Sequence, residues 1–209
     1  MTKAMALGGG AVLGSQISMR VAVRVRPYPM PHQFATALDH PWRMRYRDPV
    51  GMLGLFGLQA GMQVLDLGCG TGTFTVEMAR MVGPTGLVHA ADLQPSLLER
   101  AQQRIAEFDL LERVRLHCCG AYQLPLDDDS LDLAVMVATL SQIPNPQLAL
   151  WELQRVLKPG ARLAISEELP DPAYVPPKVT RRWAEEAGFT FGGRSGSAFC
   201  YHSIFFNRE

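Results

Sequence analysis

The sequence predicts an α/β protein with a doubly wound, mostly parallel seven-stranded sheet that carries an antiparallel C-terminal hairpin. Two observations support this fold class. From residue 62 onward, short apolar stretches alternate regularly with amphipathic ones, which is typical of β-α-β units and a parallel sheet. Near the C-terminus, two apolar stretches are separated only by Ser195-Gly196-Ser197, which indicates a hairpin rather than a crossover.

The elements can be placed one by one along the chain. Strands are expected at 62–67, 87–91, 113–118, 131–138, 161–166, 189–194 and 198–206, and helices near 73–82, 95–108, 146–157 and 178–187. Strand 131–138 is almost continuously apolar, as expected for a parallel strand covered on both faces. Pro95 suits a first helical turn, Lys158-Pro159-Gly160 ends the third helix, and Gly188 suits the position just beyond the last one.

Composition limits the class of protein. The chain has 209 residues, of which 47% are hydrophobic, enough for one domain with a sizeable core. Twenty basic and twenty acidic residues give no net charge, so we expect no nucleic-acid partner. No apolar run is long enough to cross a bilayer. The four cysteines show no C-x-x-C spacing, and we expect reduced thiols in a cytoplasmic protein.

Residues 1–29 differ from the rest, because a small, glycine-heavy apolar stretch precedes three arginines and a proline cluster. A signal peptide would explain the apolar run, but the basic residues follow it and no clear cleavage site is present. We prefer a poorly packed tail, or a misassigned start with Met30 as the true beginning. Residues 30–209 then form one domain, which opens with two weak cap helices at about 33–58.

The stretch from Val64 to Phe74 is the most informative one. It runs from an apolar strand through an acidic residue and a glycine-rich turn into a helix. Gly68, Gly70 and Gly72 accept positive φ and let a ligand approach the backbone closely. The helix offers unpaired N–H groups and its positive dipole end at the same place. Because ligands of open α/β sheets bind outside the carboxyl ends of the strands, this turn predicts a nucleotide-type binding site.

This turn resembles the first motif of class I S-adenosylmethionine-dependent methyltransferases. The dinucleotide fingerprint G-x-G-x-x-G fits less well, because its third glycine would fall on Thr73. Three later segments, 129–133, 140–144 and 153–160, also resemble family segments, so the resemblance covers about residues 50–209. It implies a Rossmann-like methyltransferase fold with S-adenosylmethionine as cofactor. The turn residues that it assigns to the cofactor are Asp66, Gly68, Cys69, Gly70, Thr71 and Gly72.

Further cofactor-binding residues are expected at the ends of later strands. Asp92 ends the second strand, 22 residues beyond Gly70, where a carboxylate can bind both ribose hydroxyls of S-adenosylmethionine or NAD. Leu93 beside it is expected to lie against the adenine. Val137, at the end of the fourth strand, completes this part of the expected site.

The segment after the third strand departs from the family pattern. The family usually reads glycine-aspartate-alanine there, and the aspartate accepts the adenine amino group, whereas this chain has Cys119, Gly120 and Ala121. The backbone of Gly120 and Ala121 can still bind the adenine edge. However, one charge-assisted hydrogen bond, of about 1.5–3 kcal/mol, has no evident replacement.

The acceptor side is less defined. The resemblance is to the ubiquinone and menaquinone type of methyltransferase, and the absence of a large inserted recognition domain favours a small-molecule acceptor. Methyl transfer needs mainly proximity and alignment, with a base only where the nucleophile is protonated. Arg43 and Arg47 could reach the methionine carboxylate or substrate, or form a solvated helix face. Pocket candidates are His40, Tyr46, Glu167, Tyr174 and His202, with Glu167 best placed and no base assigned.

Two other functions remain open at this point. A non-catalytic protein that binds S-adenosylmethionine or S-adenosylhomocysteine is supported by Gly120 in the adenine position. An NAD-dependent oxidoreductase is the weaker alternative, because both the glycine spacing and the segment Leu157-Lys158-Pro159-Gly160 favour the methyltransferase. The sequence assigns neither the acceptor atom nor the oligomeric state.

Overall fold

The computed structural model of the chain describes residues 39–169 and 171–208. All seven expected strands form one sheet in the order β3-β2-β1-β4-β5-β7-β6. The strands are β1 (Gln63–Leu67), β2 (Leu87–Asp92), β3 (Val114–Cys118), β4 (Leu131–Val137), β5 (Leu157–Glu168), β6 (Thr190–Gly196) and β7 (Cys200–Phe206). The helices are α3 (Pro41–Arg47), α4 (Pro49–Leu55), α5 (Thr73–Val82), α6 (Pro95–Glu107), α7 (Pro146–Val156) and α8 (Pro177–Glu186), with 3₁₀ turns η2 (Leu111–Arg113) and η3 (Leu140–Gln142).

The pairing of the strands confirms the expected fold class. Strands β1 to β5 pair in parallel, while β7 runs antiparallel to both β5 and β6. The chain first builds outward from β1 through β2 to β3, and then returns to place β4 on the other side of β1. In open α/β sheets, ligands bind at such a reversal of strand order, outside the carboxyl ends of the two strands that flank it, here β1 and β4.

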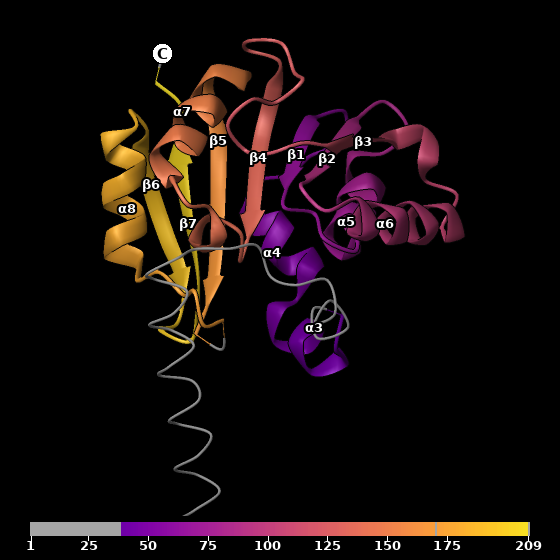
Figure 1. Ribbon diagram of the computed structural model, residues 1–209, viewed down its shortest axis with the longest axis horizontal. Coiled ribbons are helices and arrows are strands. Elements are labelled where there is room, and N and C mark those ends of the chain that lie inside the picture. Colours follow the sequence, from indigo (N-terminus) through magenta and orange to yellow (C-terminus); the bar gives the residue numbers. More distant parts are fainter. Residues whose placement is uncertain (1–38, 170, 209) are drawn as a thin grey trace, which may run out of the picture.

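Helices cover both faces of the sheet (Figure 1). One apolar core lies under α4, α5 and α6, and the other lies under α7 and α8. Strand β4 contributes to both, because Val135 belongs to the first core and Met136 to the second. This explains why its sequence is apolar without alternation. Within the described part of the chain, no helix combines the length and the apolarity that a membrane crossing requires.

Helices α3 and α4 lie within the range 33–58, where the sequence analysis expected two cap helices. His40 and Asp48 cap α3 and α4 with their side chains, and a proline follows each cap at the first helical position. Helix α4 buries Met52 and Leu53, whereas the buried residues of α3 are two arginines. Figure 1 shows both helices near the ends of the β4 and β5 arrows. The proposed tail at 1–29 and the start of the cap at 33–38 lie outside the described residues.

Strand boundaries differ from the sequence-based expectation at β5 and in the C-terminal hairpin. Strand β5 begins at Leu157 rather than at 161, because Leu157 already pairs with Leu131 before the register shifts. The segment Lys158-Pro159-Gly160 therefore lies within an irregular strand rather than before it. Strand β6 also continues through Gly196, so the hairpin turn lies at 197–199, later than the expected 195–197, and is closed by the Ser197 N–H donating to the Cys200 carbonyl oxygen.

Gly188 shows why a glycine follows the last helix. Its φ is +104°, a conformation that residues with a side chain rarely adopt, and a Cβ atom there would lie 2.4 Å from Nε2 of Gln154. The turn it makes lets the Phe189 N–H donate to the Ala184 carbonyl oxygen, which ends α8 and starts the chain toward β6.

We expect Gly188→Ala to lower the free energy of unfolding by about 1–2 kcal/mol, the cost of placing a side chain in left-handed backbone. Gly54→Ala is the matched control, because Gly54 is in α4 and a Cβ atom added there would meet no described atom within 4 Å. That variant should gain about 0.5–1 kcal/mol from its helical backbone. Urea unfolding measures both changes, and equal effects of the two substitutions would contradict this explanation.

Candidate functional site

The glycine-rich loop after β1 is tied to the neighbouring strand. The N–H groups of Gly68 and Cys69 both donate to the Ala91 carbonyl oxygen of β2, at 2.8 and 3.1 Å. Gly68 has φ +77°, and a Cβ atom there would lie 2.4 Å from the side chain of Thr139 in the loop after β4. The loop therefore packs closely against the β4 loop, and only glycine fits at this contact.

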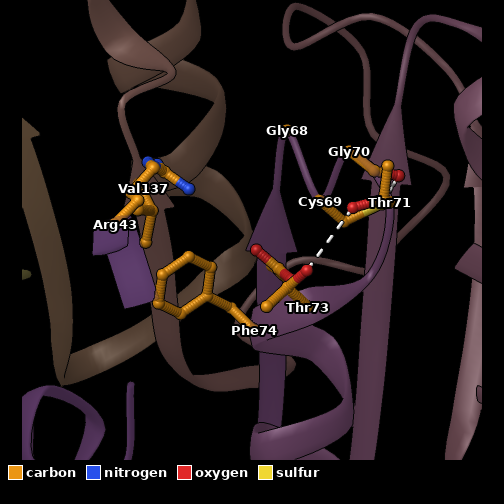
Figure 2. A pocket seen from close by; sticks show the side chains of 9 residues that line it. Arg43, Gly68, Cys69, Gly70, Thr71, Thr73, Phe74 and Val137 are labelled. Atoms are coloured by element: carbon orange, nitrogen blue, oxygen red, sulfur yellow. Dashed lines mark hydrogen bonds between the residues drawn. The ribbon is translucent and has the colours of Figure 1, made fainter. Parts of the chain in front are cut away.

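The loop borders a small cavity between the carboxyl ends of β1 and β4. Six of the expected cofactor-binding residues line it, namely Asp66, Gly68, Cys69, Gly70, Thr71 and Val137. Arg43 from α3 and Thr73 and Phe74 from α5 complete the lining. Figure 2 shows Arg43 and Val137 on one side of this cavity and the glycine-rich loop on the other. Thr73 and Phe74 were missed by the sequence prediction, although both directly follow the glycine turn.

The other expected cofactor-binding residues do not line this cavity. Gly72 caps α5 and packs against Ala101 of α6, whose Cβ atom would lie 3.0 Å from an added side chain. Leu93 is 58% exposed at the end of β2. Gly120 follows β3, and a Cβ atom there would meet only the Leu93 side chain, at 4.0 Å. Ala121 packs against the core under α7 and α8.

Asp92, at the end of β2, joins the glycine-rich loop to the start of α6. Its Oδ2 accepts a hydrogen bond from the Gly70 N–H and its Oδ1 accepts one from the Gln94 N–H, both at 2.9 Å. Burial raises the pKa of Asp92, and these backbone donors counteract that effect. Each carboxylate oxygen has a second lone pair, so Asp92 could accept two further hydrogen bonds from hydroxyl groups of a ligand.

Asp66 is the buried acidic residue at the end of β1. Its Oδ2 accepts a hydrogen bond from the Thr75 hydroxyl at 2.6 Å. Burial raises the pKa of Asp66 to about 7, although the bond from Thr75 lowers it. The carboxyl group is therefore both a hydrogen-bond donor and an acceptor near neutral pH.

The segment before α3 is attached to the glycine-rich loop. The Asp39 carboxylate binds both guanidinium Nη atoms of Arg104 in α6, at 2.9 and 2.8 Å. It also accepts hydrogen bonds from the hydroxyls of Thr71 and Thr73. Burial raises the pKa of Asp39, but these hydrogen bonds outweigh it and hold the pKa below its usual range. The cluster of Asp39, Thr71, Thr73 and Arg104 thus fixes the segment before α3 against the glycine-rich loop.

A second charged cluster fixes α3 to the end of β5. Glu168 accepts hydrogen bonds from Nε of Arg43 at 2.7 Å, from Nε of Arg47 at 3.0 Å and from the Tyr46 hydroxyl. Burial raises the pKa of Glu168, but Arg47 and Arg43 lower it to about 2. Arg47 also donates to the Ser166 hydroxyl. Because Arg43 and Arg47 are buried, they do not form the solvated helix face that the sequence left open.

Glu167 lies beside Glu168 on β5 but points to the opposite face of the sheet, where its cross-strand partner is Tyr201. Its Oε1 accepts a hydrogen bond from the Ser141 N–H at 3.4 Å, and its side chain is fully buried. Burial and the negative charge of Asp171 raise the pKa of Glu167 to about 8. Glu167 is therefore mostly protonated at neutral pH.

The remaining candidates do not reach the cavity wall. The His40 ring caps α3, and the Tyr174 hydroxyl donates to the Ala198 carbonyl oxygen at 3.1 Å. The His202 Nδ1 lies 2.8 Å from the Ser166 hydroxyl, and burial lowers the pKa of His202 to about 4. The His40 contact is local to α3, the Tyr174 contact joins the loop before α8 to the hairpin turn, and the His202 contact joins β7 to β5.

Comparison with known proteins decides the family. A family model described as a methyltransferase domain matches residues 58–186. The chain belongs to this methyltransferase family. The match includes the glycine-rich loop, Asp92 and the whole β1–β5 part of the sheet, so the resemblance noted in the sequence is confirmed.

The proteins similar to this chain include two methyltransferases and one cyclase. The chain is 37% identical over 121 residues to the demethylmenaquinone methyltransferase of Lactiplantibacillus plantarum. This match covers 57% of this chain and 51% of the relative. A crystal structure of a SAM-dependent methyltransferase from Aquifex aeolicus is 29% identical, with a TM-score of 0.81, and the match covers 86% of this chain and 100% of that chain. The [4+2]-cyclase SpnF is 26% identical, with a TM-score of 0.65, and the match covers 73% of this chain and 59% of that one. The chain spans about half the length of the curated relatives it matches.

Replacing Glu167 with glutamine removes a carboxyl group that must stay protonated while buried. The pKa of Glu167 is 4.5 in the unfolded chain and about 8 in the folded one. The free energy of unfolding is therefore unaffected by this group below pH 4.5 and decreases as the pH rises from 4.5 toward 8, because the unfolded chain releases the proton first. We therefore expect Glu167→Gln to become more stable than the wild type by about 1.4 kcal/mol for each pH unit across this range. Urea unfolding at a series of pH values measures the difference.

Glu168→Gln provides a control of opposite sign. The pKa of Glu168 is lowered from 4.5 to about 2, so its contribution to stability is complete above pH 4.5 and is lost as the pH falls toward 2. This variant should be less stable than the wild type at neutral pH and approach it in acid. If neither stability difference changes with pH, the two carboxyl groups do not titrate as described.

Proposed function

We propose that this protein is a cytoplasmic methyltransferase that transfers a methyl group from S-adenosylmethionine to a small-molecule acceptor by in-line displacement. The observation that carries the proposal is the preorganised pair formed by the glycine-rich loop and Asp92, within a chain of the methyltransferase family. S-adenosylmethionine supplies an already activated methyl group, so the protein has to bind, orient and exclude water rather than form a covalent intermediate.

Asp92 is the proposed acceptor for the ribose hydroxyls. The Gly70 and Gln94 N–H groups fix its carboxylate from one side and leave lone pairs for a ligand on the other. Leu93, Gly120 and Ala121 lie beyond it at the ends of β2 and β3, where the adenine would bind. The exposure of Leu93 suits a side chain that becomes covered only when a planar base packs against it.

The cavity beside the glycine-rich loop is the proposed site of the methionine part of the cofactor. Asp66 lies in one wall and Arg43 in the opposite one, so the ammonium and the carboxylate group of the methionine part each find a hydrogen-bond partner. The cavity has a volume of about 30 Å³, whereas small-molecule sites usually measure several hundred. Cofactor binding therefore requires α3 or the Arg43 side chain to move outward.

The acceptor is proposed to bind between α3 and the ends of β4 and β5. Tyr46, Arg43 and Glu168 lie on this side, and exposed Trp42 and Phe199 extend it with apolar surface. The matching relatives include demethylmenaquinone methyltransferases, which makes an aromatic, quinone-like acceptor the first class to test. A non-catalytic, cofactor-binding role is the alternative, because a fold alone does not fix a reaction.

We expect S-adenosylhomocysteine and S-adenosylmethionine to raise the melting temperature, and NAD to leave it unchanged. A ligand that binds only the folded state adds about 2.7 kcal/mol of stability at a hundredfold excess over its Kd. Asp92→Ala should weaken binding by roughly tenfold to a hundredfold, because charge-assisted hydrogen bonds to the ribose are lost. Isothermal titration calorimetry gives the two Kd values.

The variants Asp92→Asn and Asp127→Ala complete this experiment. Asp92→Asn keeps one acceptor oxygen and should bind with an affinity between those of the wild type and Asp92→Ala. Asp127 is exposed and remote from the loop, so Asp127→Ala changes the net charge alone and should bind like the wild type. Well-folded wild type that binds neither nucleoside would refute the proposed function. Binding without turnover on any quinone-like acceptor would favour the non-catalytic alternative.

The missing adenine-binding aspartate leads to a gain-of-affinity prediction. Gly120 has ordinary backbone geometry, and an added Cβ atom would meet only the Leu93 side chain at 4.0 Å, so an aspartate fits there. We expect Gly120→Asp to tighten S-adenosylhomocysteine binding by about tenfold, through one charge-assisted hydrogen bond to the adenine amino group. Gly120→Ala, titrated in parallel, should show no gain. A larger Kd for Gly120→Asp than for the wild type would indicate that the adenine binds elsewhere.

A further inference from the structure

A groove with a strongly basic lining lies at the β6 end of the sheet, under the N-terminal half of α8. Its volume is about 290 Å³, and its walls are Pro177, Lys178 and Arg181 of α8, Phe191 and Arg194 of β6, and Ser203 of β7. None of these residues lines the cavity beside the glycine-rich loop. Three of the six lining residues are cationic and none is acidic.

The charges of this groove are only partly compensated within the described residues. Arg181 pairs with Glu185 at 2.9 Å on the exposed surface of α8 and stacks over the Phe191 ring at 4.4 Å. No salt bridge within 4 Å joins Lys178 or Arg194 to an acidic residue in the described part of the chain. The groove therefore has a net positive charge beside an aromatic surface.

Ser203 provides an independent sign of a ligand. It is only 1% exposed, and its hydroxyl has no hydrogen-bond partner among the described residues. Ser203 faces Arg194 directly across the β6–β7 pairing, so its side chain and the arginine share one face of the hairpin. A buried hydroxyl without a partner is costly, and a ligand oxygen in the groove would satisfy it.

The N-terminus of α8 also favours a bound anion in this groove. Its cap residue is Pro176, which gives no side-chain hydrogen bond, and the first turn contains no acidic residue. Instead it contains Lys178, although the positive end of the helix dipole disfavours a cation there. Pro177 has no N–H, and the N–H groups of Val179 and Thr180 donate to the Pro176 carbonyl oxygen, which leaves the Lys178 N–H for a ligand. A bound anion would accept from this N–H and offset the Lys178 charge.

We propose that this groove is a second ligand site, which binds the phosphate group of a small phosphorylated molecule. Lys178, Arg181 and Arg194 supply the charge, and the Ser203 hydroxyl donates to a phosphate oxygen. Pro177 and Phe191 form an apolar wall against which the organic part of the ligand packs. The site is separate from the methyl-transfer site, and no covalent step takes place in it.

Isothermal titration calorimetry of the full chain with inorganic phosphate and with phenyl phosphate, at constant ionic strength, tests the proposal. We expect Kd values on the order of 0.1–1 mM, with phenyl phosphate the tighter ligand because its ring reaches the apolar wall. Arg194→Ala and Ser203→Ala should each weaken binding by about tenfold, the effect of losing one hydrogen bond to a charged group. Equal affinity for the two ligands would restrict the site to the phosphate group itself and remove the apolar wall from the proposal.

Two controls keep the test specific. Arg182 lies on α8 outside the groove and pairs with Glu186, so Arg182→Ala removes the same charge as Arg194→Ala and should leave both Kd values unchanged. Ser203→Ala should melt at the same or a higher temperature than the wild type without ligand, because it removes an unpaired buried hydroxyl. No binding at about 10 mM ligand, or equal weakening by Arg182→Ala, would overturn the proposal. Asp92→Ala should bind phosphate normally, so this result is independent of cofactor binding.

Discussion

The hydrogen bond from the Gly70 N–H to the Asp92 carboxylate is the contact on which the proposed cofactor site depends. It joins the loop after β1 to the end of β2, and the same carboxylate also accepts the Gln94 N–H at the start of α6. One buried side chain thus positions two strand-to-helix connections at the reversal of strand order. Because the two donors are backbone N–H groups, the fold itself sets the orientation of the Asp92 carboxylate.

Much of this architecture was predictable because it depends on local pattern. Alternating apolar stretches located the seven strands along the chain and indicated a mostly parallel sheet, although they did not give the strand order, and the glycine spacing of the turn located the cavity loop. The charged contacts of α3 were not predictable, since Glu168 is 125 residues from Arg43 and 121 from Arg47. No periodicity links such distant residues. The early start of β5 was missed for a similar reason: the pairing of Leu157 with Leu131 outweighs the local preference of proline and glycine for a turn.

Glu167 and Glu168 show how strand geometry gives neighbouring residues opposite chemistry. Successive side chains of a strand point to opposite faces, so Glu168 meets two arginines of α3 while Glu167 enters the layer that contains Tyr201. The pKa values of about 2 and about 8 follow from these surroundings and not from the residue type. The sequence indicated Glu167 as the best placed of the pocket candidates and did not single out Glu168, because only the packing distinguishes a fixed charge from a buried neutral acid.

Strand β6 is the last strand on its side of the sheet, so one of its edges is not paired with another strand of the sheet. An unpaired strand edge can recruit a strand of another chain and begin aggregation. Here the register shifts between Phe191 and Gly193, and Gly192 lies so close to the Phe206 ring that a Cβ atom would be 2.4 Å from it. The bulge twists the edge, the glycines weaken its preference for extended pairing, and Arg194 adds a charge. The features that shape the basic groove therefore also make this edge a poor template for fibril growth.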